Sequence, residues 1–316
     1  MAPSRFPVHS ATPGPDRASH AAHGAVHDRG IMTSQRLRIL PPAGAGHWPP
    51  GRARGTAGGR LPATPRSLLM VERSIMVYRR AWPLLISGFF EPLFYLLSIG
   101  LGLGALVGKV PGPAGRPIGY VDFVAPAMLA SASMNGAVFD STFHVFFKLK
   151  YDKLYDSVLA TPMTVGDIAV GEITWALLRG AFYAAMFLLV MAIIGLLHSP
   201  WAAAALPGAV LVGWAFAATG MAATCYMRSW QDFDFITLAM VPMFLFSGTF
   251  YPLTVYPRIL QVLVQCTPLY QGVALLRGLT LGVVGPGLLG HAGYLAAMGL
   301  AGRAVAVRRL GALLLR

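Results

Sequence analysis

Three ionisable residues, Glu91, Asp140 and Arg179, interrupt long apolar stretches of the sequence. A charge inside a membrane is costly, and it is usually paired or functional. Counted from the stretch ends that are predicted to face the cytoplasm, all three lie about 10 Å deep at the helical rise per residue. This common depth permits an ion pair between Asp140 and Arg179, with Glu91 nearby. The alternatives are that Arg179 extends to the membrane interface and that the carboxylates are protonated or hydrated.

The sequence patterns that would supply an enzyme active site or an energy source are missing. The closest approach to a phosphate-binding loop runs from Gly104 to Lys109, but its glycine spacing is wrong and no Ser or Thr follows to hold magnesium. No paired-cysteine or HExxH metal-binding pattern occurs, and the scattered serines and histidines form no nucleophilic arrangement. We therefore expect no catalytic residue, cofactor site or metal site in this chain.

The composition predicts that the chain lies in a membrane. Of its 316 residues, 55% are hydrophobic and only 12% are charged, a balance that soluble domains of this size rarely have. The apolar residues come in blocks of about 20, the length of a membrane-spanning helix. We therefore expect an all-α integral membrane protein with six transmembrane helices, at about residues 83–107, 121–147, 173–197, 202–227, 235–251 and 287–307.

Prolines divide the region between the fifth and sixth predicted spans. Pro252, Pro257 and Pro268 separate short apolar runs, and breaks at this spacing prevent one continuous spanning helix. We expect a proline-broken re-entrant or interfacial hairpin on the outer face, because irregular backbone is tolerated in a membrane only where protein covers it.

Residues 1–64 differ from the rest of the chain. They are rich in Pro, Gly, Ala, His and Arg without apolar periodicity, so we expect a disordered basic tail, and they lack the apolar core of a signal peptide. Nine arginines and two aspartates in residues 1–66 account for +7 of the net charge of +13. No basic face interleaved with aromatic residues occurs elsewhere, so we expect no nucleic-acid binding. The alternative is that the natural chain starts later, at Met32 or Met70. Residues 65–316 are expected to form the membrane domain.

A short amphipathic helix is predicted just before the first span, over residues 65–82. One side carries an apolar stripe at helical spacing, made of Leu68, Val71, Ile75, Tyr78 and Trp82. The other side carries basic residues seven positions apart, namely Arg66, Arg73 and Arg80. Such a helix would lie in the cytoplasmic interface, with its arginines facing headgroups or water. The alternative is a plain continuation of the first span.

The charged stretch 148–172 between the second and third predicted spans contains another short amphipathic helix. Its apolar positions pair at a spacing of four, Tyr151 with Tyr155 and Leu154 with Val158, and Leu159 follows them. Pro162 ends this helix, and Thr164 with Asp167 resembles the capping box of the next one. An apolar face exposed to the cytosol, with nothing of its own to pack on, indicates a partner surface. The alternative is an ordinary loop that lies on the headgroups.

Lysines and arginines beside the predicted span ends set the orientation, because cytoplasmic loops carry the excess. One set of alternate loops holds eleven of them: Arg66, Arg73, Arg79, Arg80, Lys148, Lys150, Lys153, Arg228, Arg303, Arg308 and Arg309. The other set holds four: Lys109, Arg116, Arg258 and Arg277. We therefore expect both termini and the 148–172 stretch in the cytoplasm. Cys225 and Cys266 then lie on opposite sides of the membrane, so we expect no disulfide and two small buried side chains.

Five segments of the sequence resemble the permeases of ABC-2 type transporters. These segments are Gly88–Tyr95, Asn135–Asp140, Leu159–Pro162, Phe246–Pro252 and Thr267–Tyr270. They are most similar to the NodJ-like subfamily of nodulation-factor exporter permeases, which is related to exporters of lipo-oligosaccharides, polysaccharides and daunorubicin-type drugs. The resemblance extends from about residue 66 to the C-terminus.

The resemblance implies a transport subunit and not an enzyme. Permeases of this family form homodimers in the plasma membrane and bind two cytosolic ATPase subunits, which hold the ATP and magnesium. The region Tyr151–Asp167 would couple to the ATPase, and the helix at residues 65–82 would form a second contact. The cargo would be an amphipathic lipo-oligosaccharide, polysaccharide, glycolipid or drug. No family motif marks the transport path, so the significance of Glu91, Asp140 and Arg179 depends on their positions alone.

Two other classes of protein remain as alternatives. A proton-coupled secondary transporter would use Glu91 and Asp140 as proton carriers. A membrane-embedded transferase or protease would need a catalytic constellation that the sequence does not contain.

Overall fold

The computed structural model describes residues 66–80, 90, 93–112 and 117–314. The predicted basic tail, residues 1–64, lies outside these ranges, as does Glu91. All of the described residues belong to the second of two compact units of the chain, Gly58–Arg316.

The described part of the chain is almost entirely helical. Two short antiparallel strands, β1 (Lys109–Pro111) and β2 (Pro117–Gly119), are the exception. In chain order the helices are α1 (Arg66–Arg80), a stretch at 93–98, η1 (Ile99–Leu103), α3 (Gly104–Val107), α4 (Tyr120–Phe139), η3 (Asp140–His144), α5 (Val145–Lys150), α6 (Leu154–Leu159), α7 (Val165–Ile194), η4 (Pro200–Ala204), α8 (Ala205–Thr224), α9 (Asp232–Phe246), η5 (Leu253–Val255), α10 (Arg258–Gln265), α11 (Pro268–Leu281) and α12 (Pro286–Leu314).

A helical stretch lies at each of the six predicted span positions, the first being described mainly from residue 93 onward. By length and composition alone, two of the described helical segments could cross a membrane, Val165–Ile194 and Pro200–Thr224. The pair α10 and α11 meets the same criteria together but bends by 83° at the break between the two helices. This bend lies within the region where prolines predicted a broken hairpin. The count of six spans stays a prediction.

The second predicted span is one helical segment with an irregular turn inside it. Helices α4 and α5 are joined without a break by η3, a π-helical turn in which the backbone hydrogen bonds widen by one residue. Pro126 stands within α4 and does not end it. The π turn falls at Asp140, the ionisable residue that the sequence places in the middle of an apolar stretch.

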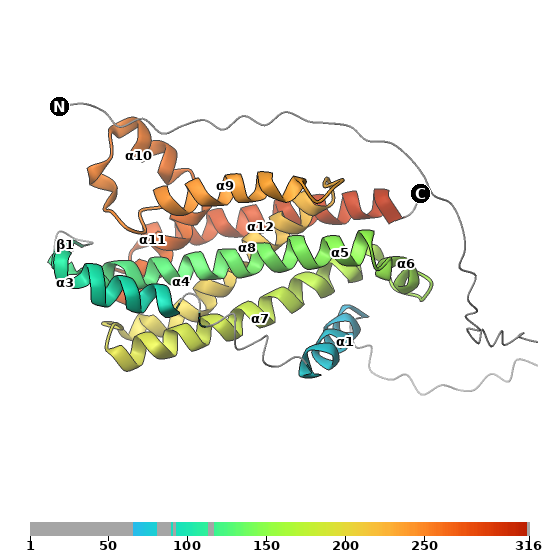
Figure 1. The fold of residues 1–316 in the computed structure, drawn as a ribbon, viewed down its shortest axis with the longest axis horizontal. Helices are drawn as coiled ribbons and strands as arrows, with labels where there is room; N and C mark the ends of the chain where they lie inside the picture. Colours follow the sequence, from blue (N-terminus) through green and yellow to red (C-terminus); the bar gives the residue numbers. More distant parts are fainter. Residues whose placement is uncertain (1–65, 81–89, 91–92, 113–116, 315–316) are drawn as a thin grey trace, which may run out of the picture. The chain divides into compact units, whose positions relative to one another are not determined.

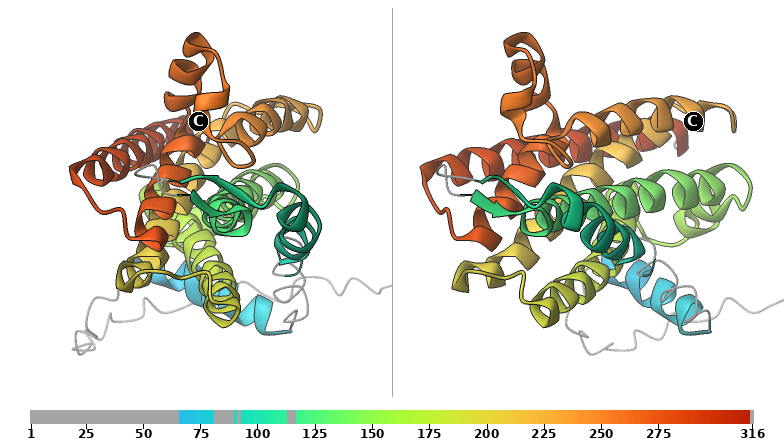
Figure 2. Two further views of the ribbon diagram at one scale, coloured as in Figure 1. Left: turned by 90° about the vertical axis from the view of Figure 1, so that its left-hand side faces the viewer. Right: turned by 60° about the vertical axis from the view of Figure 1, so that its left-hand side comes forward.

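Helix α8 lies among α4, α7 and α12 and contacts all three (Figures 1 and 2). Small residues permit the close approach. A Cβ atom added at Gly302 of α12 would lie 2.7 Å from the backbone nitrogen of Thr219, and one at Gly299 would lie 2.5 Å from the Trp214 ring. Close contact through small residues is the usual way in which helices associate in a membrane, where lipid removes the hydrophobic driving force.

The two ends of this helical unit differ in how many lysines and arginines they carry. Helices α5 and α6 and the end of α12 lie at one end, whereas β1, α10 and α11 lie at the other (Figure 1). The first end carries Lys148, Lys150, Lys153, Arg308 and Arg309. All five belong to the loops that the sequence assigns to the cytoplasmic side. Residues predicted on one side of the membrane therefore lie at one end of the unit.

The two cysteines are free, and their surroundings differ. Cys225 is buried, as expected, but Cys266 is exposed, so the expectation of two buried cysteines was wrong for Cys266. Cys266 lies at the 83° bend between α10 and α11 and not within a continuous spanning helix, which is what its expected burial assumed.

Candidate functional site

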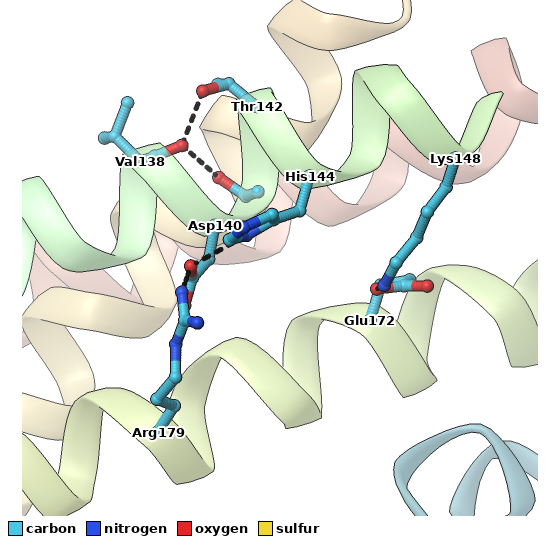
Figure 3. A network of polar contacts seen from close by, with 8 residues as sticks. Val138, Asp140, Thr142, His144, Lys148, Glu172 and Arg179 are labelled. Carbon is cyan, nitrogen blue, oxygen red and sulfur yellow. Dashed lines mark hydrogen bonds and ion pairs between the residues drawn. The ribbon is translucent and has the colours of Figure 1, made fainter. Parts of the chain in front are cut away.

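The structure brings Asp140 and Arg179 together as a buried ion pair (Figure 3). The Nε–H group of Arg179 donates to Oδ2 of Asp140 at 2.7 Å, and Nη2 of the same guanidinium contacts Oδ1. The side chains are 11% and 6% exposed. Two parallel contacts between a guanidinium and a carboxylate fix the orientation of both groups, so α7 is tied to the π turn of the α4–α5 segment.

His144 extends this polar contact by one helical turn (Figure 3). Its Nδ1 atom lies 3.1 Å from Oδ1 of Asp140. Beside the π turn, the carbonyl of Val138 accepts hydrogen bonds from the hydroxyls of Thr142 at 2.7 Å and Ser141 at 3.3 Å. Both hydroxyls are buried, and these bonds satisfy them within the same segment.

A second buried ion pair lies one further turn toward α6. The Nζ group of Lys148 donates to Oε2 of Glu172 at 2.7 Å, and the side chains are 22% and 5% exposed. Between the two pairs is a small cavity of about 50 Å³, lined by Asp140, His144, Lys148, Glu172, Trp175 and Ala176. We call Asp140, His144, Lys148, Glu172 and Arg179 the polar column (Figure 3).

Tyr155 of α6 lies at the end of the polar column. Its side chain is fully buried, and within the described ranges neither its hydroxyl nor Oε1 of Glu172 has a partner with hydrogen-bond geometry. Burial raises the pKa of Tyr155 well above its usual value, and the nearby carboxylate of Glu172 raises this pKa further, while Arg73 opposes the shift. The phenol is therefore held in its neutral form beside the carboxylate.

The structure corrects the predicted orientation of the 148–172 helix. Tyr151 follows α5 and is 63% exposed, and Lys153, with a φ of 46°, turns the chain before α6 begins at Leu154. Tyr151 and Tyr155 therefore do not share a helical face. The apolar side of α6 is not exposed to the cytosol, because Tyr155 is buried and Leu154, Val158 and Leu159 pack against the core.

The outer surface of this region is polar. Asp152, Lys153, Asp156 and Ser157 are exposed, and so is Pro162, which follows the end of α6. The predicted capping box of α7 is present: the Asp167 backbone N–H donates to the Thr164 hydroxyl oxygen, and the Thr164 N–H donates to the Asp167 carboxylate at 3.0 Å. Any partner at this end would meet charged and polar groups of α6 and not its apolar face.

The amphipathic helix before the first span is present as α1 and packs on α7. Its buried residues are Met70, Val71 and Ser74, whereas Leu68 and Ile75 are 43% and 45% exposed. The predicted stripe is therefore split, and only Val71 of its described side chains is buried. Arg73 is exposed, while the side chains of Arg66 and Arg80 lie outside the described part of the structure.

A glycine of α7 permits this contact. A Cβ atom added at Gly171 would lie 2.6 Å from Cβ of Met70 and 3.0 Å from the carbonyl oxygen of Ser67. Gly171 precedes Glu172 of the polar column, so the place where α1 crosses α7 is also the place where the column meets α6.

The sequence did not predict three members of the polar column: His144, Lys148 and Glu172. Asp140, His144 and Lys148 follow one another at spacings of four, and Glu172 and Arg179 are seven apart. Both spacings put polar residues on one side of a helix, so the spacing in the sequence could have indicated this row of polar side chains. Among the described residues, the polar column included, no three His, Cys, Asp or Glu side chains gather as a metal site would require.

Comparison with known proteins identifies the family. The family model of the ABC-2 type transporters matches residues 67–281. Nodulation protein J of Sinorhizobium fredii (strain NBRC 101917 / NGR234) is 34% identical over 234 residues, which cover 73% of this chain and 87% of that protein. Nodulation protein J of Rhizobium leguminosarum bv. viciae is 33% identical over 227 residues, which cover 70% of this chain and 85% of that protein.

These matches agree with the segments that resembled ABC-2 type permeases of the NodJ-like subfamily, and they confirm that resemblance. They also support the predicted class, a membrane-embedded transport subunit of an ABC exporter and not an enzyme. The chain belongs to the ABC-2 type transporter family.

Proposed function

We propose that the chain is the permease subunit of an exporter that moves an amphipathic substrate across the plasma membrane. The substrate class is a lipo-oligosaccharide, polysaccharide, glycolipid or drug, and a separate ATPase subunit supplies the energy. Relatives named for nodulation, at 33–34% identity over most of their length, support the first of these substrates.

The proposed topology has six spans, both termini in the cytoplasm and α6 on the cytoplasmic side. The gathering of basic side chains at the α6 end of the helical unit supports this orientation, because such residues are retained in the cytoplasm. A second copy of the chain would complete the transporter as a homodimer, with lipid around it.

The observation that carries the proposal is the anchoring of α6 to the polar column. Tyr155 is 0% exposed and lies beside Glu172, which pairs with Lys148, and the next turn leads to the Asp140–Arg179 pair. A push on the exposed side of α6 would therefore reach the interior of the helical unit through packed groups. A coupling helix needs such a rigid connection.

The partner surface would be the exposed polar side of this region. Tyr151, Asp152, Lys153 and Asp156 are available to a cytosolic ATPase, with Pro162 and Asp167 shaping the turn into α7. Helix α1, with Arg73 exposed, would form a second contact. ATP and magnesium would bind to the partner.

The test is reconstitution into proteoliposomes with and without the co-purified ATPase. We expect ATP-dependent transport of a lipo-oligosaccharide only when both subunits are present, and the charge reversals Asp152→Lys and Asp156→Lys should weaken co-purification. Transport by the chain alone would contradict the proposal. Transport that stops when the proton gradient is collapsed, with ATP maintained, would favour a proton-coupled carrier instead.

A further inference from the structure

The guanidinium of Arg277 is held at the end of the helical unit opposite α6. Arg277 belongs to α11, which lies at that end (Figure 1). Its Nε and Nη2 groups donate to the carbonyl of Phe123 at 3.2 and 3.0 Å, and Nη2 also donates to the carbonyl of Gly248 at 2.9 Å. The guanidinium carbon lies 3.7 Å from the centre of the Phe123 ring. Contacts from α4 and from the turn after α9 therefore fix its position.

The positive charge of Arg277 has no negative partner in the described ranges. None of the ion pairs there includes Arg277, and its hydrogen bonds end on neutral carbonyl oxygens. Within the same ranges, the two N–H groups of Nη1 have no hydrogen-bond partner. Arg277 is partly buried, and a partly buried guanidinium is stabilised by an accompanying anion.

A cavity of about 390 Å³ adjoins this charge. Helices α11 and α12 and the turn between them form its walls. Tyr270, Arg277 and His291 provide polar groups, and Val283, Val284 and Leu288 provide apolar ones. His291 donates from Nδ1 to Oε1 of Gln271, which fixes the ring. The volume lies within the range of small-ligand sites, about 300–1,000 Å³.

The cavity opens to the outside of the chain on its apolar side. Val283 and Val284 at its rim are 43% and 46% exposed. A ligand would thus place an anionic group against Arg277 and an apolar portion against the valines and the surrounding lipid. Such a division between charged and apolar walls matches the junction of headgroup and acyl chain in an amphiphile.

We propose that this cavity binds the phosphate group of an anionic amphiphile, with Arg277 as its counter-ion. A guanidinium presents paired N–H donors that match the oxygens of a phosphate. Tyr270 and His291 border the same space and add polar contacts. A phospholipid headgroup and free phosphate both carry such oxygens, and the experiment distinguishes between these two ligands.

The experiment measures equilibrium binding to the purified full-length chain in neutral detergent. The probes are radiolabelled phosphatidylglycerol and, separately, radiolabelled orthophosphate, with phosphatidylcholine as the zwitterionic control. We expect saturable binding of phosphatidylglycerol that phosphatidylcholine does not displace. Displacement by orthophosphate would identify a site for the free anion, and its failure to displace would identify a headgroup site.

Two glycines of α12 provide a matched pair of variants. An added Cβ at Gly287, which lines the cavity, or at Gly290, which does not, would meet no atom within 4 Å. Gly287→Trp should lower the affinity by about tenfold or more, equivalent to about 1.4 kcal/mol, whereas Gly290→Trp should leave it unchanged. Arg277→Gln should abolish binding. If that variant does not fold, the comparison of Gly287→Trp with Gly290→Trp tests the proposal by itself.

Two results would overturn the proposal: no saturable binding of either probe, or equal binding by the Gly287→Trp and Gly290→Trp variants. The readout involves neither ATP nor transport. A failure here would therefore leave the exporter function proposed above intact, and a failure of ATP-dependent transport would leave this binding site intact.

Discussion

Lys148 and Glu172, 24 positions apart in the sequence, form a 2.7 Å ion pair between α5 and α7. The pair stands between the Asp140–Arg179 pair on one side and the buried ring of Tyr155 on the other. It therefore joins the interior of the helical unit to α6. If a separate ATPase drives transport, as proposed above, this pair would carry a displacement of α6 to the interior.

The first prediction concerns the removal of one partner of this pair. Lys148→Met leaves the buried carboxylate of Glu172 without its counter-ion, which should cost about 3–5 kcal/mol of stability. The thermal unfolding midpoint in detergent, followed by tryptophan fluorescence, measures this change. The double variant Lys148→Met, Glu172→Met should recover most of the loss, because no charge stays unpaired. Additive effects in this double-mutant cycle would show that the two side chains do not interact.

The second prediction separates the structural role of Asp140 from proton carriage. Asp140→Asn removes the bidentate partner of Arg179 and should lower the unfolding midpoint, and Arg179→Gln added to it should restore the midpoint. In an exporter driven by ATP, the double variant should retain transport. A proton carrier that depends on Asp140 would be inactive as the double variant even when its stability is restored. Transport and thermal stability are measured on the same preparations.

The sequence predicted the Asp140–Arg179 pair more readily than the Lys148–Glu172 pair for a physical reason. Asp140 and Arg179 stand alone in apolar stretches, where an unpaired charge is costly, so their common depth was informative. Lys148 and Glu172 belong to a stretch with many charges, where exposure to water is the ordinary expectation. Their burial depends on how α7 crosses α5 and α1, which is a property of the packed helices.

The orientation of α6 was predicted wrongly because of one residue. A helix that continued from Tyr151 would have put Tyr151 and Tyr155 on the same side. Lys153 instead adopts a positive φ, which is uncommon for residues other than glycine, and restarts the helix in a new direction. No local pattern of side chains marks this turn, whereas the capping box at Thr164 and Asp167 is a local pattern and was found.

The third prediction tests the crossing of α1 and α7 at Gly171. Gly171→Ala places a Cβ within 2.6 Å of Met70 and 3.0 Å of the Ser67 carbonyl oxygen, and the overlap should cost about 1–3 kcal/mol. Met70→Ala in the same chain should not recover the loss, because alanine keeps the Cβ atom that the new methyl group meets and the Ser67 carbonyl is unchanged. Gly180→Ala is the control, since Gly180 lies on α7 with no atom within 4 Å of an added Cβ. Equal unfolding midpoints for the two alanine variants would contradict the close crossing.

The fourth prediction concerns Tyr155, whose neutral form the fold favours. Tyr155→Phe keeps the buried ring and removes only the hydroxyl beside Glu172, so it should cost at most about 1–3 kcal/mol. Tyr155→Ala removes a fully buried ring and should cost about 3–5 kcal/mol. The buried ring should therefore contribute more to the anchoring of α6 than the hydroxyl does. A loss with phenylalanine as large as the loss with alanine would contradict this.

The same residue gives the stability a pH dependence of known sign. The pKa of Tyr155 is raised in the folded chain by burial first and by Glu172 second, so the unfolded chain loses this proton at lower pH than the folded chain. The stabilisation is fully present below the ordinary tyrosine pKa of about 10, and it is lost as pH rises through the folded value. Unfolding midpoints measured from pH 8 upward should therefore fall above about pH 10, and fall less in Tyr155→Phe than in the wild type. Parallel curves for the two proteins would mean that Tyr155 ionises as readily in the folded chain as in the unfolded one, and that α6 does not enclose its ring.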